Sequence, residues 1–209
     1  IKEIADQNWN KTWEENFDPI NVEGKCMVRA PFHEADTSVT FDIVIDPKMS
    51  FGTGHHATTY LMLNELFEMD VEGKAVLDMG CGTGVLAILA HMKQANEVLA
   101  IDIDDWAYEN TLENIRNNNC EEIKVLKGGA EQISGQFDVI LANINRNILL
   151  ADMPNYIKAL NQQGEILLSG FFESDVDQLL ESTSQHGLSL VNKAVKDEWC
   201  MLHFKINDE

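Results

Sequence analysis

A glycine-rich turn and an aspartate that follows it are the residues best suited to chemistry in this chain. Residues 76–84 read V-L-D-M-G-C-G-T-G, an apolar run that enters a loop with Gly80, Gly82 and Gly84. Glycines at a strand-to-helix turn permit positive φ and let a ligand approach the backbone, and the following helix offers free N–H groups. The next apolar run ends in Asp102, where a carboxylate could accept hydrogen bonds from ribose hydroxyls. Although a tight turn alone would also need glycine, the combination predicts a nucleotide-type ligand.

The spacing of the glycines and the position of Asp78 indicate which ligand this is. A dinucleotide site usually reads G-x-G-x-x-G, whereas this loop reads G-x-G-x-G. Asp78 precedes the first glycine by two residues, and a carboxylate pointing into the loop would repel a pyrophosphate and suit an ammonium group. S-adenosylmethionine carries a ribose, an amino-acid end and a sulfonium cation, but no phosphate. The loop therefore favours S-adenosylmethionine over NAD.

The elements that must position this loop alternate along the chain. Short apolar runs alternate with helical patterns, and the runs lie at residues 75–79, 98–101, 123–126, 137–142 and 165–169. Apolar strands separated by helices are typical of a parallel sheet that is covered on both faces. The final runs, 188–195 and 199–206, are too close together for a crossover, so the last strand should run antiparallel. The sequence predicts an α/β fold, a Rossmann-like doubly wound sheet of seven strands with an antiparallel last strand.

Several stretches resemble one protein family. The glycine loop with Asp102 resembles the first two motifs of class I S-adenosylmethionine-dependent methyltransferases, and the predicted sheet resembles their fold. Residues 51–59, F-G-T-G-H-H-A-T-T, resemble the F-G-T-G-x-H-x-T-T signature of bacterial methyltransferases that modify the eleventh protein of the large ribosomal subunit. Further likeness lies in A-N-I at 142–144, S-G at 169–170 and W-E-E-N-F at 13–17. The resemblance therefore runs along nearly the whole chain.

This resemblance implies an activity, a partner and a domain organisation. It implies transfer of methyl groups from S-adenosylmethionine to amino groups of the large-subunit ribosomal protein, on lysine side chains, the N-terminal amine or both. It also implies a small N-terminal recognition domain, which is absent from this chain. We expect residues 1–46 to form a linker helix and lead strands beside that absent domain, and residues 47–209 to form the methyltransferase domain.

The resemblance also assigns residues to the cofactor site. It places Gly80, Gly82, Gly84 and Asp102 against the cofactor, together with two residues of the signature, Phe51 and Thr59. Phe51 would cover the cofactor as an apolar lid, although a core position suits a phenylalanine nearly as well. Thr59 would reach the cofactor's carboxylate, although its hydroxyl could equally cap the helix that begins there.

Asn143 and His56 are the residues expected closest to the transferred group. Asn143 ends an apolar strand at the carboxyl edge of the sheet, where it would contact the cofactor and accept a hydrogen bond from a substrate amine. Its alternative role is to cap the following helix. His56 falls on the histidine of the signature and is the candidate catalytic residue, with ordering of its loop as the alternative. His55 and His56 lack a third ligand nearby, so we expect no metal.

Composition limits the partners and the cell compartment. The net charge of −20 argues against holding a phosphate backbone by bulk electrostatics, so we expect no nucleic acid, and it suits a basic protein partner. The four cysteines are scattered and contain no C-x-x-C pair, which favours reduced thiols in the cytoplasm. Because no apolar run could span a bilayer, we expect no membrane contact. A monomer is the expected oligomeric state.

Three other functions agree with parts of the sequence. Methyltransferases of RNA or DNA adenine commonly carry N-P-P-Y or D-P-P-Y where residues 143–146 read N-I-N-R, without an aromatic side chain to stack on a flipped base. A nicotinamide dehydrogenase is disfavoured by the loop spacing and by Asp78. A domain that binds the cofactor without turnover stays open on the sequence alone.

Overall fold

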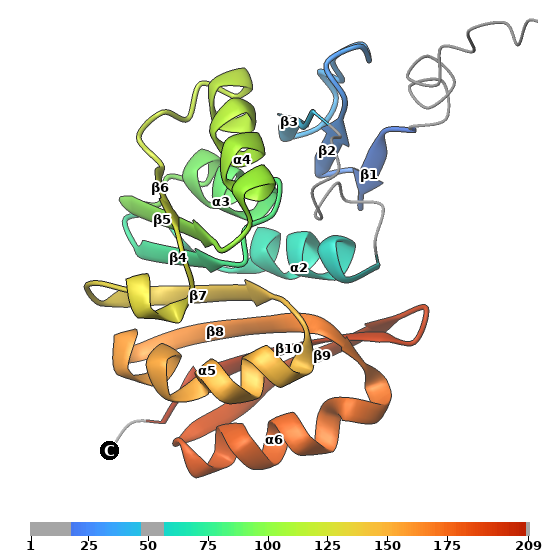
Figure 1. The fold of residues 1–209 in the computed structure, drawn as a ribbon. Coiled ribbons are helices and arrows are strands. Elements are labelled where there is room, and N and C mark those ends of the chain that lie inside the picture. Colours follow the sequence, from blue (N-terminus) through green and yellow to red (C-terminus); the bar gives the residue numbers. More distant parts are fainter. Residues whose placement is uncertain (1–17, 47–56, 208–209) are drawn as a thin grey trace, which may run out of the picture.

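The computed structural model describes residues 18–46 and 57–207, and these residues form one large and one small sheet (Figure 1). The strands of the large sheet have the order β6-β5-β4-β7-β8-β10-β9. Their bounds are β4 (Ala75–Met79), β5 (Glu97–Asp102), β6 (Lys124–Lys127), β7 (Phe137–Asn143), β8 (Leu160–Phe172), β9 (Leu188–Lys196) and β10 (Trp199–Ile206). The strands β4 to β8 pair in parallel, and β10 runs antiparallel to both β8 and β9. The predicted seven-stranded sheet with its antiparallel last strand is confirmed.

Five α-helices of the described residues cover the two faces of this sheet. Their bounds are α2 (Ala57–Glu68), α3 (Val85–Met92), α4 (Asp105–Asn117), α5 (Arg146–Ala159) and α6 (Val176–Gln185), with short 3₁₀ turns η1 (Ala130–Gln132) and η2 (Glu173–Asp175). Figure 1 shows α2, α3 and α4 on one side of the sheet and α5 and α6 on the other. The result is the three-layer, doubly wound arrangement that the sequence predicts.

Alternation within the strands builds a separate core on each face. In β4, Val76 packs with α2 and α3, whereas Leu77 and Met79 pack with α5 and α6. Successive strand residues point to opposite faces, and both faces are covered, so both sets must be apolar. This explains why the strands read as apolar throughout.

The small sheet carries the order β1-β2-β3, with β1 (Ile20–Val22), β2 (Cys26–Arg29) and β3 (Phe41–Val44). The sequence predicts strands near β2 and β3 but not β1, because three residues are too few for a readable pattern. Buried residues of this sheet, including Val28 and Ile43, share one hydrophobic core with α2 and α3. The boundary at residue 46 stays a prediction, because no separate core sets the small sheet apart.

Some element bounds differ from the expectation. The strand expected at 165–169 is the middle of β8, which runs from Leu160 to Phe172. Its first part, N-Q-Q-G at 161–164, is polar and hides the strand pattern, and the pairing with β7 is irregular there. Pro154 lies inside α5, so the idea that it marks the start of that helix is wrong. The helical pattern expected over residues 1–18 falls almost wholly outside the described residues.

Among residues 18–46 and 57–207, no helix combines the length and the apolar character needed to cross a membrane.

Candidate functional site

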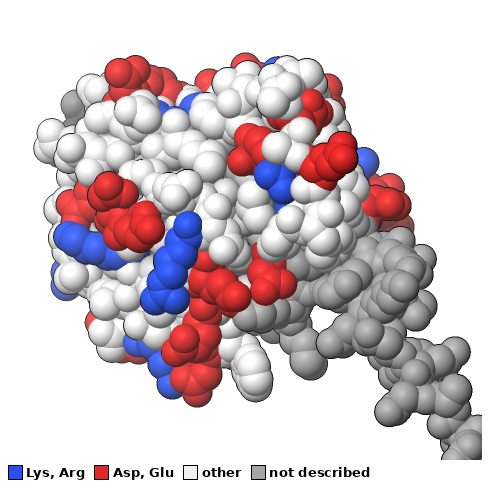
Figure 2. Space-filling view, turned by 90° about the horizontal axis from the view of Figure 1, so that it is seen from above, with Lys and Arg blue, Asp and Glu red and all other residues white. Residues whose placement is uncertain are grey.

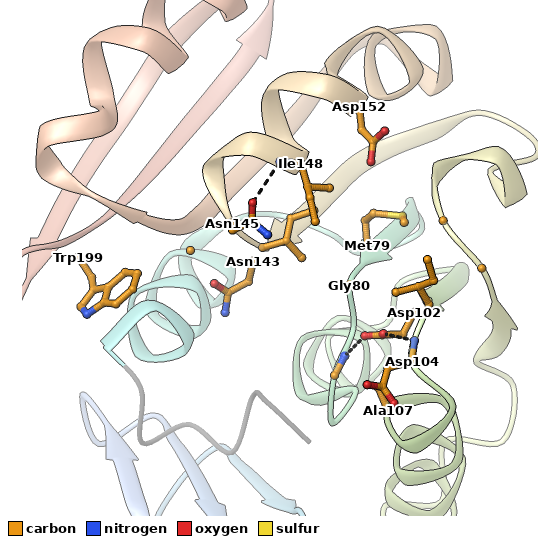
Figure 3. A pocket seen from close by; sticks show the side chains of 16 residues that line it. Met79, Gly80, Asp102, Asp104, Ala107, Asn143, Asn145, Ile148, Asp152 and Trp199 are labelled. Atoms are coloured by element: carbon orange, nitrogen blue, oxygen red, sulfur yellow. Dashed lines mark hydrogen bonds between the residues drawn. The ribbon is translucent and has the colours of Figure 1, made fainter. Parts of the chain in front are cut away.

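A cavity of about 520 Å³ opens at the carboxyl ends of the central strands. Figure 3 shows Asp102 and Asp104 on one side, Asn143 and Asn145 on the other, and Met79 between them. This is where the strand order reverses, because the chain steps outward through β5 and β6 and then returns to β7 beside β4. Ligands of open α/β sheets bind at such a switch point. The cavity is therefore the candidate site.

Gly80 and Gly82 line this cavity, as predicted for a loop that meets a ligand through its backbone. Gly80 has φ of 69°, and a Cβ added there would lie 2.2 Å from Ile144 Cγ2. Gly82 has φ of 58°. Any side chain at Gly80 would be strained and would also press into the wall of the cavity.

Gly84 has a different position from the other two glycines. It does not belong to the cavity lining; it caps the N-terminus of α3 with φ of 78°, and an added Cβ would lie 2.8 Å from Thr111 Cγ2. Packing against α4 thus explains this glycine. Its predicted contact with the cofactor stays a prediction.

Asp102 ends β5 with its carboxylate held by the backbone on both sides. Its Oδ2 accepts from the Gly82 N–H at 2.9 Å, and its Oδ1 accepts from the Asp104 N–H at 2.9 Å. The residue is 9% exposed and lines the cavity. Since each carboxylate oxygen can accept more than one hydrogen bond, Asp102 is oriented and can still accept hydroxyl groups from a ligand.

The position of Asp78 differs from the expectation. Its carboxylate does not line the cavity; it is 1% exposed, and its Oδ2 accepts from the Ala87 N–H in the first turn of α3 at 3.1 Å. Burial raises the pKa of Asp78 to about 7. This residue therefore fixes the helix behind the loop, and the expected direct meeting of Asp78 with a ligand's ammonium group is not what the structure shows.

The acidity of the cavity comes from three other carboxylates. Asp102, Asp104 and Asp152 line it, and the lining among the described residues contains no lysine or arginine. Burial, and then the charge of Glu131, raises the pKa of Asp152. That carboxylate therefore lies in a desolvated, negatively charged environment that would be relieved by a hydrogen-bond donor or a cation.

Asn143 presents an open hydrogen-bond acceptor beside the cavity. Its Nδ2 donates to Thr59 Oγ1 at 3.3 Å, while its Oδ1 is buried and has no hydrogen-bond partner among the described residues. The alternative role as a helix cap is wrong, because Asn145 caps α5 by accepting from the Ile148 N–H. A buried amide oxygen without a partner is unfavourable unless something else supplies the donor.

Thr59 lies in the first turn of α2, 1% exposed, behind Asn143. It is absent from the lining of the cavity, and its hydroxyl holds the Asn143 side chain. Its predicted contact with the cofactor's carboxylate stays a prediction. Phe51 and His56, the remaining predicted site residues, lie outside the described residues, as does His55.

Trp199 is a site residue that the sequence reasoning missed. It begins β10, lines the cavity, and stacks on Phe172 with ring centroids 4.1 Å apart. It is far from the motifs in the sequence and reaches the site only because β10 inserts beside β8. A lone tryptophan after a tight turn carries no signal of this. The described residues also contain no cluster of three or more His, Cys, Asp or Glu side chains arranged to hold a metal ion.

Comparisons with known proteins give this site a family. The family model of "Ribosomal protein L11 methyltransferase (PrmA)" matches residues 1–207. Ribosomal protein L11 methyltransferases of Porphyromonas gingivalis and Phocaeicola vulgatus are 50% and 46% identical, over 95% and 98% of this chain and 70% and 74% of their own length. A crystal structure of ribosomal protein L11 methylase from Lactobacillus delbrueckii subsp. bulgaricus superposes with a TM-score of 0.84, at 27% identity, over 91% of this chain and 100% of that one.

The same motifs that resemble this family in the sequence form the cavity in the structure: the glycine loop, Asp102 and Asn143. The extent of the family match, together with the identity to these relatives, is sufficient for assignment. The chain belongs to the ribosomal protein L11 methyltransferase family.

Proposed function

We propose that this chain transfers methyl groups from S-adenosylmethionine to amino groups of ribosomal protein L11, on lysine side chains, the N-terminal amine or both. The observation that carries the proposal is a single cavity bounded by an oriented carboxylate, Asp102, and by the open amide oxygen of Asn143. The first group suits a ribose, and the second suits an amine. The names of the relatives support the identity of the methyl acceptor.

The residues of the cavity fit S-adenosylmethionine better than a phosphate-bearing cofactor. The carboxylates of Asp102, Asp104 and Asp152 create a negative potential that attracts an ammonium or sulfonium group and repels a pyrophosphate. Gly80 and Gly82 offer backbone without side chains to the amino-acid end of the ligand. When bound, S-adenosylmethionine supplies the methyl group, whose bond to sulfur breaks as its bond to the acceptor nitrogen forms.

Asp102 would bind the ribose without reorganisation. The N–H groups of Gly82 and Asp104 hold both of its carboxylate oxygens, so the remaining lone pairs already have fixed directions. A group that is oriented before binding loses little conformational entropy when the ligand arrives. The carboxylate and the glycine loop therefore act as one preformed surface.

Asn143 would orient the acceptor nitrogen. The reacting amine must be neutral and must point its lone pair at the methyl group. An α-amino group, whose pKa in peptides is about 7.7–8.0, is partly neutral in the cell, whereas a lysine, whose pKa is about 10.4, must first lose a proton. Asn143 Oδ1 can accept one N–H of the neutral amine and thereby direct the lone pair. His56 remains the candidate for taking the proton.

The surface charge suits a basic substrate. The chain carries a net charge of −20, and Figure 2 shows Asp and Glu side chains spread over the displayed face with few Lys and Arg side chains between them. Complementary charge raises the rate of encounter between partners and orients their approach. A basic ribosomal protein is the kind of partner that such a surface favours.

Mass spectrometry of L11 tests the proposal. Purified L11 is incubated with this chain and S-adenosylmethionine, and peptides are examined for added methyl groups on lysines and on the N-terminus. We expect methylation that disappears with Asp102→Ala. L11 that stays unmodified by this chain, and also by a version extended to the full length of its relatives, would contradict the proposal.

A further inference from the structure

Three asparagines lie along one buried face of α4 and its C-terminal cap. Asn110, Asn114 and Asn118 are spaced by four residues, so they lie one above another on the helix, and they are 1%, 0% and 9% exposed. Asparagine is an indifferent helix former, and each buried amide needs hydrogen-bond partners. Such a row is therefore expected only where these amides have a particular task.

On one side, this row binds the end of β3 and the residues after it. Asn118 Oδ1 accepts from the Val44 N–H at 2.8 Å, and its Nδ2 donates to the Val44 carbonyl at 2.7 Å. Asn114 Oδ1 accepts from the Asp46 N–H at 2.8 Å, and Asn110 Nδ2 donates to the Asp46 carbonyl at 3.2 Å. The Ile45 N–H points to β2 instead, where it donates to the Arg29 carbonyl at 2.8 Å.

The repeats of the two elements explain this match. Four helical residues rise about 6 Å, and two residues of an extended chain advance about 6.6 Å. Side chains at every fourth position of α4 therefore meet every second residue of the extended segment, here Val44 and Asp46. The helix takes the place of a neighbouring strand along this edge.

On the other side, α4 binds carbonyl groups of the glycine loop. Asn114 Nδ2 donates to the Thr83 carbonyl at 2.9 Å, and Thr111 Oγ1 donates to the Gly82 carbonyl at 2.8 Å. Both hydrogen bonds are buried. Of the three asparagines, Asn114 binds the extended segment and the loop at once, whereas the hydrogen bonds of the Asn118 side chain reach Val44 and its own helix.

We infer that Asn114 is a positioning residue for cofactor binding, which couples the backbone at Asp46 to the glycine loop. The inference rests on the proposed cofactor site. A loop with three glycines at positive φ has many conformations, and ordering it on binding would weaken affinity. By fixing the Thr83 carbonyl, Asn114 keeps the loop in one of them.

The coupling runs in both directions. A ligand that orders the loop must also strengthen the hold of Asn114 on the Asp46 N–H, because one side chain makes both bonds. Phe51 and His56, the predicted site residues that follow Asp46 in the chain, would then begin from a backbone position tied to the occupied loop. The small sheet and the cofactor cavity would respond to each other through α4.

The test compares Asn114→Ala with Asn118→Ala as a matched pair. Each variant loses a buried amide of the same face, so both should unfold at lower temperature. Calorimetric titration with S-adenosylhomocysteine, at a temperature where circular dichroism shows both variants folded, measures the affinity. We expect Asn114→Ala to bind about tenfold more weakly, the equivalent of one buried hydrogen bond, and Asn118→Ala to bind within about twofold of the wild type. Equal affinities for the two variants would overturn the inference.

Two measurements keep the test decisive if Asn114→Ala does not fold. Thr111→Val removes only the bond to the Gly82 carbonyl and should weaken S-adenosylhomocysteine binding severalfold. In the wild type, hydrogen exchange at the Asp46 amide should slow when S-adenosylhomocysteine binds, and an unchanged rate would overturn the inference. Absence of any binding to the wild type would instead contradict the proposed function, so the two failures are distinguishable.

Discussion

The two walls of the cavity differ in how completely their polar groups are bound. On the wall built by β4, β5 and α4, the Asp102 carboxylate accepts two backbone hydrogen bonds, and the carbonyls of Gly82 and Thr83 are held by α4. On the wall built by β7, β8 and β10, the amide oxygen of Asn143 is buried and has no partner among the described residues. Both walls meet at Gly80.

This difference indicates a division of labour. A wall whose hydrogen bonds are already made has a fixed shape and suits a ligand that returns in every cycle. A wall with an open acceptor suits a group that arrives for the reaction only, because leaving the acceptor unpaired between cycles is a penalty that the arriving amine removes. We therefore assign the cofactor to the first wall and the acceptor amine to the second.

Removal of the Asn143 amide tests this assignment with the largest expected effect. Asn143→Ala should lower kcat by about 10²–10³-fold, the loss typical of a donor or acceptor aligned with the reacting group, with little change in the Kd of S-adenosylhomocysteine. Thr59→Val is the control, because it removes the partner of Asn143 Nδ2 and leaves the amide in place. Its kcat should fall less. If Asn143→Ala weakens the inhibitor and spares kcat, the assignment of the walls is reversed.

The rigidity of the second wall depends on a buried ion cluster behind it. His203 of β10 lies between two carboxylates, with Nδ1 at 2.8 Å from Glu65 and Nε2 at 2.9 Å from Glu165. Burial alone would lower the pKa of His203, but hydrogen bonds and charge from these two groups outweigh it and raise that pKa from 6.5 to about 9. The pKa values of Glu65 and Glu165 are lowered, chiefly by their hydrogen bonds to His203.

The sign of the pH dependence follows from these shifts. Protonated His203 stabilises the fold fully below about pH 6.5, and this contribution is lost as pH rises through about 9. The carboxylates contribute above their ordinary pKa and lose that contribution as pH falls through their lowered values. Urea unfolding between pH 6 and pH 10 should show a loss of up to about 3 kcal/mol in the wild type that His203→Gln lacks. Parallel curves for the two proteins would refute this role of the cluster.

The Asp102 carboxylate gives a smaller effect on the first wall. Asp102→Asn keeps the shape but loses the charge and one acceptor, so the Kd of S-adenosylhomocysteine should rise by about tenfold to thirtyfold. The kcat at saturating cofactor should change much less than with Asn143→Ala. Calorimetry and steady-state kinetics measure the two quantities, and an unchanged Kd would show that the ribose does not bind there.

Gly80 and Gly73 form a matched pair that isolates the junction of the walls. Both have positive φ, 69° and 71°, so alanine is strained at either position. An added Cβ meets Ile144 at Gly80 and nothing within 4 Å at Gly73. Thermal unfolding should show Gly80→Ala about 1–2 kcal/mol less stable than Gly73→Ala, and only Gly80→Ala should weaken S-adenosylhomocysteine. Equal stability and equal affinity would remove the tight contact from the account.

Local sequence patterns predict the first wall far better than the second. The expected helix 85–92 and strand 75–79 match α3 and β4 residue for residue, because glycines and apolar runs mark their ends. Asp102 is predicted by its position at the end of a strand. The pattern does not reveal that Asp78 turns toward α3, since a carboxylate beside a helix N-terminus and one beside a ligand look alike in a sequence.

Tertiary pairing decides the second wall, which explains what the sequence could not show. Trp199 reaches the cavity because β10 inserts between β8 and β9, a placement that no spacing within the chain expresses. Asn143 and Asn145 are two residues apart and chemically the same, yet one caps α5 and the other leaves its oxygen open. Only the backbone geometry at the end of β7 separates these roles.

A crystal structure of this chain with S-adenosylhomocysteine tests the central claim most directly. We predict the compound in the cavity, with its ribose hydroxyls within hydrogen-bond distance of the Asp102 carboxylate and its sulfur on the side of Asn143. An empty cavity at saturating compound, or a compound bound elsewhere on the chain, would contradict the account.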